Sequence, residues 1–86
     1  MKKLRDQIDA VDRQIVALLG KRLEIAREIA RVKKREKLPI LDAKREALIR
    51  EELRSLAKEQ GLSAPVVEEI FQLILDYSRL EMEMTQ

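Results

Sequence analysis

The chain has 86 residues, of which 40% are charged, 45% are hydrophobic and only 2% are aromatic. This length corresponds to one small domain, 1–86, and the hydrophobic content is too high for a disordered segment. The absence of Cys and His excludes a disulfide framework, a thiol nucleophile, a Ser-His-Asp triad and the usual zinc sites. A formal net charge of +2 is too small to indicate nucleic-acid binding.

No apolar run approaches the roughly 20 residues that a membrane-spanning helix needs, which argues against a membrane protein. The first residues, Met1 to Asp6, are not followed by the apolar stretch of a signal peptide. We therefore expect a soluble, cytoplasmic protein, and the lack of Cys is consistent with a reducing compartment.

The composition is typical of an all-α fold, because it is rich in helix-forming residues and contains only two Gly and two Pro. The first predicted element is a long helix over roughly Lys3–Arg35. One stripe of this helix repeats in alternating steps of four and three residues, the heptad spacing of helices packed against one another. The positions of this seam are Leu4, Ile8, Val11, Ile15, Leu18, Arg22, Ile25, Ile29 and Val32.

A helix of this length is about 50 Å long. A compact globule of this size has a radius of gyration near 12 Å, so the helix should extend beyond its own domain. The seam on the overhanging part would then be exposed to water. A second copy of the chain, in a homodimer, is the simplest way to cover it.

The long helix should end before Pro39, which lacks an amide donor and pushes Leu38 toward extended backbone. Asp42 is predicted to cap a second helix over Ala43–Glu59, its carboxylate accepting from a free amide of the first turn. The predicted buried side of this helix consists of Leu48, Ile49, Leu53 and Leu56.

Gly61 fits the left-handed position just after the second helix. Ser63 should begin a third helix, because Pro65 is favoured in a first turn. This third helix is the most apolar of the three by its residues Val66, Val67, Ile70, Phe71, Ile74, Leu75 and Tyr77.

Arg22 is the exception in the seam, since its other positions hold Leu, Ile or Val. Burying an unpaired guanidinium costs several kcal/mol, so Arg22 should meet a bound anion or an internal carboxylate. Equally, its side chain could extend to solvent or form a structural ion pair with Asp42 or Glu46. The residue pattern alone leaves these alternatives open.

Two other cations can be placed relative to Arg22. Lys33 follows three turns later, which brings it to within roughly 20° of the same face and about 16 Å along the axis. Arg5 lies roughly 100° around the helix, so it could reach the same pocket only from a partner subunit. Taken singly, both are ordinary surface charges.

Four segments, in this order and at these spacings, resemble the all-helical class of chorismate mutases. They are LRDQIDAVDRQIVALLGKR, the VKK of residues 32–34, LPILDAKRE and IFQLILDYS. The similarity covers nearly the whole chain without a gap. It implies one long and two shorter helices per chain, in an intertwined homodimer whose two active sites each use residues of both subunits.

The resemblance also implies a reaction, the Claisen-type rearrangement of chorismate to prephenate on the route to phenylalanine and tyrosine. This intramolecular step needs no covalent intermediate, so the lack of His and Cys is no obstacle, and it implies neither a cofactor nor a metal. The site must hold a flexible dicarboxylate in a compact conformer and supply positive charge beside the breaking ether bond. Arginines suit this task, because a guanidinium binds a carboxylate through two parallel hydrogen bonds.

Carried over by position, the resemblance gives the cations distinct roles. Arg22 and the partner subunit's Arg5 would hold the two carboxylates. Lys33 would donate to one carboxylate and to the ether oxygen, where negative charge develops. These are the catalytic candidates.

The remaining carried-over positions bind the substrate. Asp42 and Glu46 would orient its hydroxyl, with Arg45 assisting from the same wall, and Ser78 would contact a carboxylate. Without the resemblance, Asp42 would be interpreted as a helix cap, and Arg45 and Glu46 as exposed charges of the first helical turn. Ser78 alone would be satisfied by the carbonyl four residues back.

Met82 departs from the family pattern but belongs to the catalytic and substrate-binding positions. The family commonly carries Gln there, or Glu in some members, as a second donor to the ether oxygen, and Met has no donor. Losing one such donor typically costs on the order of 2.7–4 kcal/mol. Catalysis could be weaker, a shifted helix end could present Glu81 or Glu83, or docking on another shikimate-pathway enzyme could restore activity. Taken alone, Met82 is a hydrophobic plug.

Two other functions stay open at this point. Isochorismate pyruvate-lyases resemble the same class and use a similar basic pocket, but they release pyruvate. A non-catalytic helical dimerisation or regulatory module would explain the heptads, although it leaves Arg22 within them unexplained.

Overall fold

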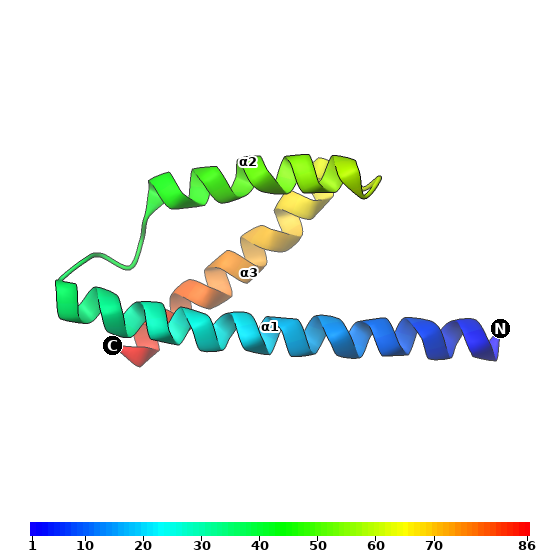
Figure 1. The fold of residues 1–86 in the computed structure, drawn as a ribbon, viewed down its shortest axis with the longest axis horizontal. Helices are drawn as coiled ribbons and strands as arrows, with labels where there is room; N and C mark the ends of the chain where they lie inside the picture. The colour runs from blue at the N-terminus through cyan, green and yellow to red at the C-terminus, as the bar shows by residue number, and fades with distance from the viewer.

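The computed structural model describes all residues, 1–86, as three α-helices without β-strands. Helix α1 spans Lys2–Glu36, α2 spans Ala43–Glu59 and α3 spans Ala64–Thr85 (Figure 1). The predicted all-α class, with one long and two shorter helices, is confirmed. None of the three helices carries an apolar stretch long enough to cross a membrane.

The end of α1 lies where Pro39 predicted it. Lys37 adopts the left-handed conformation with φ 57°, and the amide of Leu38 donates to the carbonyl of Lys33 at 2.8 Å. This satisfies carbonyl oxygens that the last turn of a helix would otherwise leave free. The chain therefore leaves α1 sharply and turns back toward α2.

The starts of the other two helices also follow local sequence signals. The Asp42 carboxylate accepts from the backbone amide of Arg45 at 3.0 Å, so its predicted capping role is confirmed. Gly61 has φ 70°, the left-handed geometry that suits glycine. Ser63 precedes α3 as predicted, with Pro65 in the first turn, although its hydroxyl makes no capping bond.

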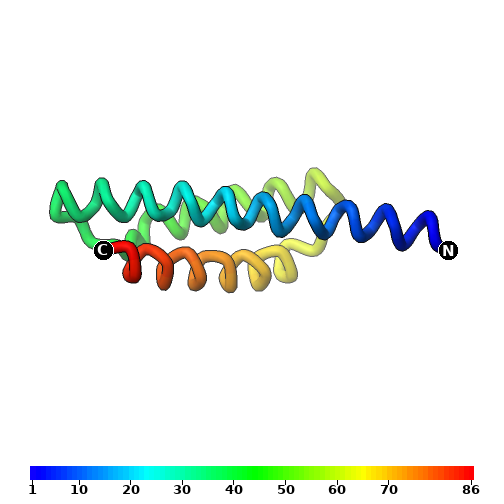
Figure 2. Tube along the Cα trace, turned by 90° about the horizontal axis from the view of Figure 1, so that it is seen from below, coloured from blue at the N-terminus to red at the C-terminus, as the bar shows by residue number.

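Helix α3 packs against both α1 and α2, whereas α1 and α2 do not contact each other. Figure 1 shows α3 running diagonally between them, and Figure 2 shows the C-terminus ending beside the C-terminal part of α1. Only 8 of the 86 residues are buried, which is a very small core for a folded chain. A single chain thus leaves much of its apolar surface exposed.

The buried face of α1 lies one position away from the predicted seam. The residues buried against the rest of the chain are Leu23, Ala26 and Ala30, whereas Ile25, Ile29 and Val32 of the seam are exposed. One residue corresponds to 100° around a helix, so α1 carries two neighbouring apolar stripes. The stripe with small alanines packs directly on α3, where a close approach is possible, and the neighbouring seam residues Arg22, Ile25 and Ile29 border the space beside this contact.

Two of the four side chains predicted to form the buried side of α2 are also exposed. Leu53 is buried and Ile49 is partly buried, but Leu48 and Leu56 are exposed. That part of the prediction is wrong for the single chain, because α2 contacts only α3 and α1 does not cover its remaining face.

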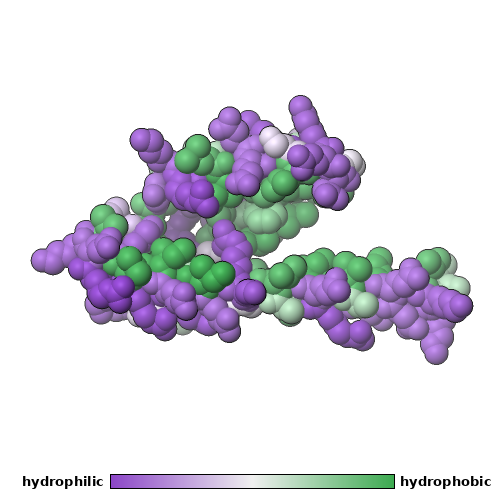
Figure 3. All heavy atoms as spheres, in the orientation of Figure 1, coloured by the Kyte–Doolittle hydropathy of each residue, from purple (hydrophilic) through white to green (hydrophobic).

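The predicted overhang of α1 is confirmed. The molecule measures 52 × 24 × 15 Å with a radius of gyration of 15.5 Å, and the N-terminal end of α1 extends past the other helices (Figure 1). Its seam residues, Leu4, Ile8, Val11, Ile15 and Leu18, are between 50% and 65% exposed. Figure 3 shows the apolar stripe that runs along this free part of α1.

Candidate active site

A cavity of about 330 Å³ lies where residues of all three helices and the loop after α1 converge. Its wall contains seven of the eight side chains that the sequence singled out. These are Arg22, Lys33, Asp42, Arg45, Glu46, Ser78 and Met82. The fold therefore brings together residues up to 60 positions apart in the chain, as the resemblance implied.

Arg22 meets a hydroxyl group rather than a carboxylate. Its Nη1 donates to Oγ of Ser78, which is only 7% exposed. Neither Asp42 nor Glu46 pairs with Arg22, so the alternative of a structural ion pair with either residue is wrong. The guanidinium charge is left without a counter-charge beside the cavity, and Ser78 is not bonded to the carbonyl four residues back.

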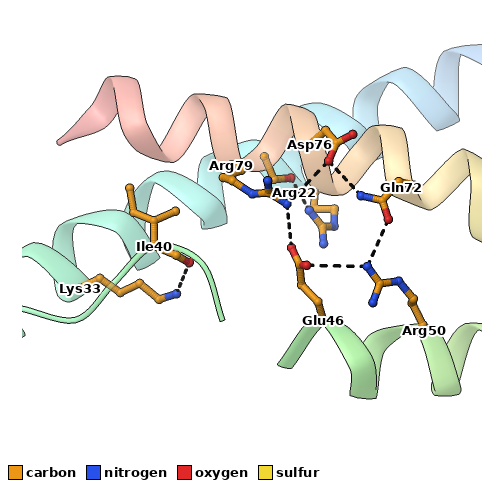
Figure 4. A network of polar contacts seen from close by, with 9 residues as sticks. Arg22, Lys33, Ile40, Glu46, Arg50, Gln72, Asp76 and Arg79 are labelled. Atoms are coloured by element: carbon orange, nitrogen blue, oxygen red, sulfur yellow. Dashed lines mark hydrogen bonds and ion pairs between the residues drawn. The ribbon is translucent and has the colours of Figure 1, made fainter. Parts of the chain in front are cut away.

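Lys33 lines the same cavity as Arg22, as their spacing on one helix predicted. Its Nζ donates to the carbonyl oxygen of Ile40 at 2.7 Å, which ties the loop after α1 to the helix (Figure 4). Lys33 has no carboxylate partner. A second cation therefore faces the cavity with its charge uncompensated.

The two carboxylates of the wall have partners of their own. Asp42 accepts from an amide in its capping role, and Glu46 lies between two arginines of α2 and α3. The Oε1 atom of Glu46 lies 3.3 Å from Nη2 of Arg79, and Oε2 lies 3.8 Å from Nη2 of Arg50 (Figure 4). The wall holds four cations and two carboxylates, so it carries a surplus of two positive charges. No group of three or more His, Cys, Asp or Glu side chains is placed to hold a metal ion.

Arg79 is the one charged residue of the wall that the sequence did not single out. It follows Ser78 directly and lies four residues after the buried Leu75, so it borders the packed face of α3. A charge that borders an apolar helical face is a weaker signal than the charge within the seam that singled out Arg22, but it could have identified Arg79. The Nε atom of Arg79 is buried and has no hydrogen-bond partner.

Arg5 is the one predicted residue outside the cavity wall. Arg5 is exposed near the N-terminal end of α1 and does not share the cavity with Arg22 of the same helix, as its position around the helix predicted. Arg5 can therefore contribute to an active site only in a dimer, at the site of the partner subunit.

Met82 is a buried residue of the wall, 9% exposed, and packs with Ala26 and Ala30 of α1. Helix α3 continues past it to Thr85, and Glu81 is bound to Arg27 at 2.8 Å. The ordered helix and this ion pair speak against a shifted end that presents Glu81. At Met82, the cavity wall is apolar.

Almost the whole chain is similar to one known protein family. The family model described as chorismate mutase type II matches residues 4–83. The chain belongs to the chorismate mutase type II family. The resemblance seen in the four sequence segments is thereby confirmed over almost the whole length.

Two of three similar proteins carry chorismate mutase in their names. The chain is 30% identical over 77 residues to a chorismate mutase of Methanocaldococcus jannaschii, covering 90% of this chain and 78% of that protein. It is 38% identical over 77 residues to a bifunctional chorismate mutase/prephenate dehydratase of Escherichia coli, covering 90% of this chain and 20% of that protein. It is 36% identical over 70 residues to the T-protein of Haemophilus influenzae, covering 81% of this chain and 19% of that protein. The chain thus spans about a fifth of the two longer relatives.

Proposed function

We propose that this chain is a chorismate mutase, which rearranges chorismate to prephenate in the biosynthesis of phenylalanine and tyrosine. One observation carries the proposal: Arg22 and Lys33 face one cavity without carboxylate partners, in a wall with a surplus of two positive charges. Such a wall matches a substrate with two carboxylates, because each guanidinium or ammonium can form charge-assisted hydrogen bonds. Membership of the chorismate mutase type II family supports the same reaction.

The proposed reaction breaks the ether C–O bond of chorismate while a new C–C bond forms within the same molecule. No atom leaves and no proton is transferred, so the site must act by positioning and by electrostatics. Arg22, already bonded to Ser78, would bind one carboxylate and hold the side chain of the substrate over its ring. Lys33 would place its ammonium beside the ether oxygen, where negative charge builds up in the transition state.

The carboxylates of the wall would bind and orient the hydroxyl group of the substrate. Asp42 and Glu46 are hydrogen-bond acceptors in the same wall, and Arg45 borders them. Half of the lining residues are apolar, among them Ile25, Ile29 and Ile40. Apolar walls exclude water from a loaded site and thereby strengthen its electrostatic contacts.

We also propose that the active protein is an intertwined homodimer in which the partner subunit's Arg5 completes each site. A single chain exposes 7180 Å², whereas a compact monomer of 10.1 kDa is expected to expose about 5,300 Å². An excess of about 1,900 Å² per chain is in the range that obligate dimers bury. The exposed seam of α1, which reaches past its own domain, supports the same assembly.

Two further aspects are proposals of the same kind. A bifunctional relative joins chorismate mutase and prephenate dehydratase by name, which supports docking of this chain on another enzyme of the shikimate pathway. As an enzyme of small-molecule biosynthesis, it is proposed to work in the cytoplasm.

The proposed function is tested by following the loss of chorismate absorbance with the purified chain and identifying the product. We expect stoichiometric prephenate and no pyruvate, without any added cofactor. Release of pyruvate would instead assign an isochorismate pyruvate-lyase type of chemistry. A folded dimer that leaves chorismate unchanged would overturn the proposal and favour a non-catalytic dimerisation module.

The dimer is tested by Ile15→Glu, which places a carboxylate in the middle of the exposed seam. Burying this charge without a partner costs several kcal/mol, so the variant should sediment as a monomer and lose at least about 10²-fold in activity. Gln14→Glu adds the same charge at a neighbouring position outside the seam and should leave both properties unchanged. A fully active, dimeric Ile15→Glu protein would refute the proposed interface.

A further inference from the structure

Five side chains of α2 and α3 form a closed polar ring at the edge of the cavity (Figure 4). Glu46 contacts Arg79 at 3.3 Å and Arg50 at 3.8 Å. Arg50 donates to Oε1 of Gln72 at 3.2 Å, and Gln72 donates to Oδ1 of Asp76 at 2.9 Å. Asp76 closes the polar ring at 3.7 Å from Nη2 of Arg79.

Only two members of the polar ring, Glu46 and Arg79, belong to the cavity wall. The side chain of Glu46 is the least exposed of the charged members, and the two charged members outside the wall, Arg50 and Asp76, are more exposed than the two within it. The polar ring therefore joins an acidic group at the cavity to a support that lies outside it. None of its members other than Glu46 was expected from the sequence.

We propose that Arg79 is a positioning residue for the substrate hydroxyl, acting through the carboxylate of Glu46, which it holds in place and whose charge it offsets. This inference rests on the proposed function, in which Glu46 accepts from that hydroxyl. A free carboxylate in the wall would repel a substrate that carries two carboxylates of its own. With Arg79 beside it, Glu46 can accept a hydrogen bond at much lower electrostatic cost.

Two of the three guanidinium nitrogens of Arg79 are not free to bind the substrate directly. Its Nη2 atom is engaged by both Glu46 and Asp76, and its Nε atom is buried away from solvent. A substrate oxygen cannot reach Nε while the side chain lies in this position. Arg22 and Lys33 differ, since neither is bound to a carboxylate.

Arg79→Met tests the inference by removing the charge and keeping much of the side-chain volume. The ion pair of Arg79 with Glu46 is intermediate in exposure between a surface pair and a buried pair. We therefore expect kcat/KM for chorismate to fall about tenfold when the charge of Arg79 is removed. Most of the loss should appear in KM, because repulsion by Glu46 acts on the bound substrate as well as on the transition state. Arg79→Lys, which keeps the charge, should recover most of the parent value.

The route through Glu46 is tested by a double-mutant cycle. In a Glu46→Gln background, which has no carboxylate to hold, Arg79→Met should change kcat/KM less than about twofold. Additive losses in the cycle would show that Arg79 acts on the substrate directly or only on the fold, and would overturn the inference. Should Arg79→Met unfold, Arg79→Gln is used in the same cycle with the same criteria.

Arg54→Met is the matched control. Arg54 binds Glu68, so this pair also joins α2 to α3, but neither residue lines the cavity. The control should lose a comparable amount of thermal stability and keep kcat/KM. An active parent with an unaffected Arg79→Met variant refutes the inference alone, whereas a parent that leaves chorismate unchanged refutes the proposed function as well.

Discussion

Arg22→Leu is expected to lower kcat/KM for chorismate by about 10²–10³-fold while the helical fold and the dimer persist. The variant loses the guanidinium of Arg22, which faces the cavity and is paired with no carboxylate in the free protein. Leucine is the ordinary residue at a heptad position, and the hydroxyl of Ser78 can bond the carbonyl four residues back instead. The unfolding temperature should therefore stay the same or rise.

Steady-state kinetics, sedimentation and thermal unfolding measured on the same preparations check this expectation. Arg27→Leu is the matched control, because Arg27 also joins α1 to α3, through Glu81 at 2.8 Å, and lies outside the cavity wall. It should lose some stability and keep its rate. A more stable Arg22→Leu protein with undiminished turnover would show that Arg22 is only a structural member of the seam.

Met82→Gln is expected to raise kcat, by up to about 10²-fold, since it adds a hydrogen-bond donor for the ether oxygen. Met82 lies one turn after Ser78 and lines the same cavity, so an amide at this position can reach the bound substrate. The gain should come with a lower unfolding temperature. Met82 packs against Ala26 and Ala30, and burying an amide there costs about 1–3 kcal/mol in the free protein.

The comparison of kcat between parent, Met82→Gln and Met84→Gln isolates this effect. Met84 is 82% exposed and is not part of the cavity wall, so the control adds the same amide without access to the substrate. If Met82→Gln left kcat unchanged, the second donor would have to come from elsewhere in the active protein. The proposed cost of an apolar residue at this position would then be wrong.

The helices and their ends were predictable from the sequence because the responsible interactions are local. The capping carboxylate of Asp42, the missing amide of Pro39 and the left-handed Gly61 each act within a few residues. The common direction of Arg22 and Lys33 follows equally from the 100° rotation per residue of one helix. Family resemblance supplied the wall positions Asp42, Arg45, Glu46, Ser78 and Met82, which no spacing within one helix predicts.

Contacts between helices depended on the tertiary structure. The sequence alone left open whether Arg22 meets an anion, a carboxylate or solvent, and the crossing of α1 and α3 brings it to Ser78, whereas Glu46 pairs with Arg79. The same crossing selects the stripe of Ala26 and Ala30 over the heptad seam, because small residues permit a close approach. Periodicity determines which side chains share a face, but only the angle and offset between packed helices decide which faces meet.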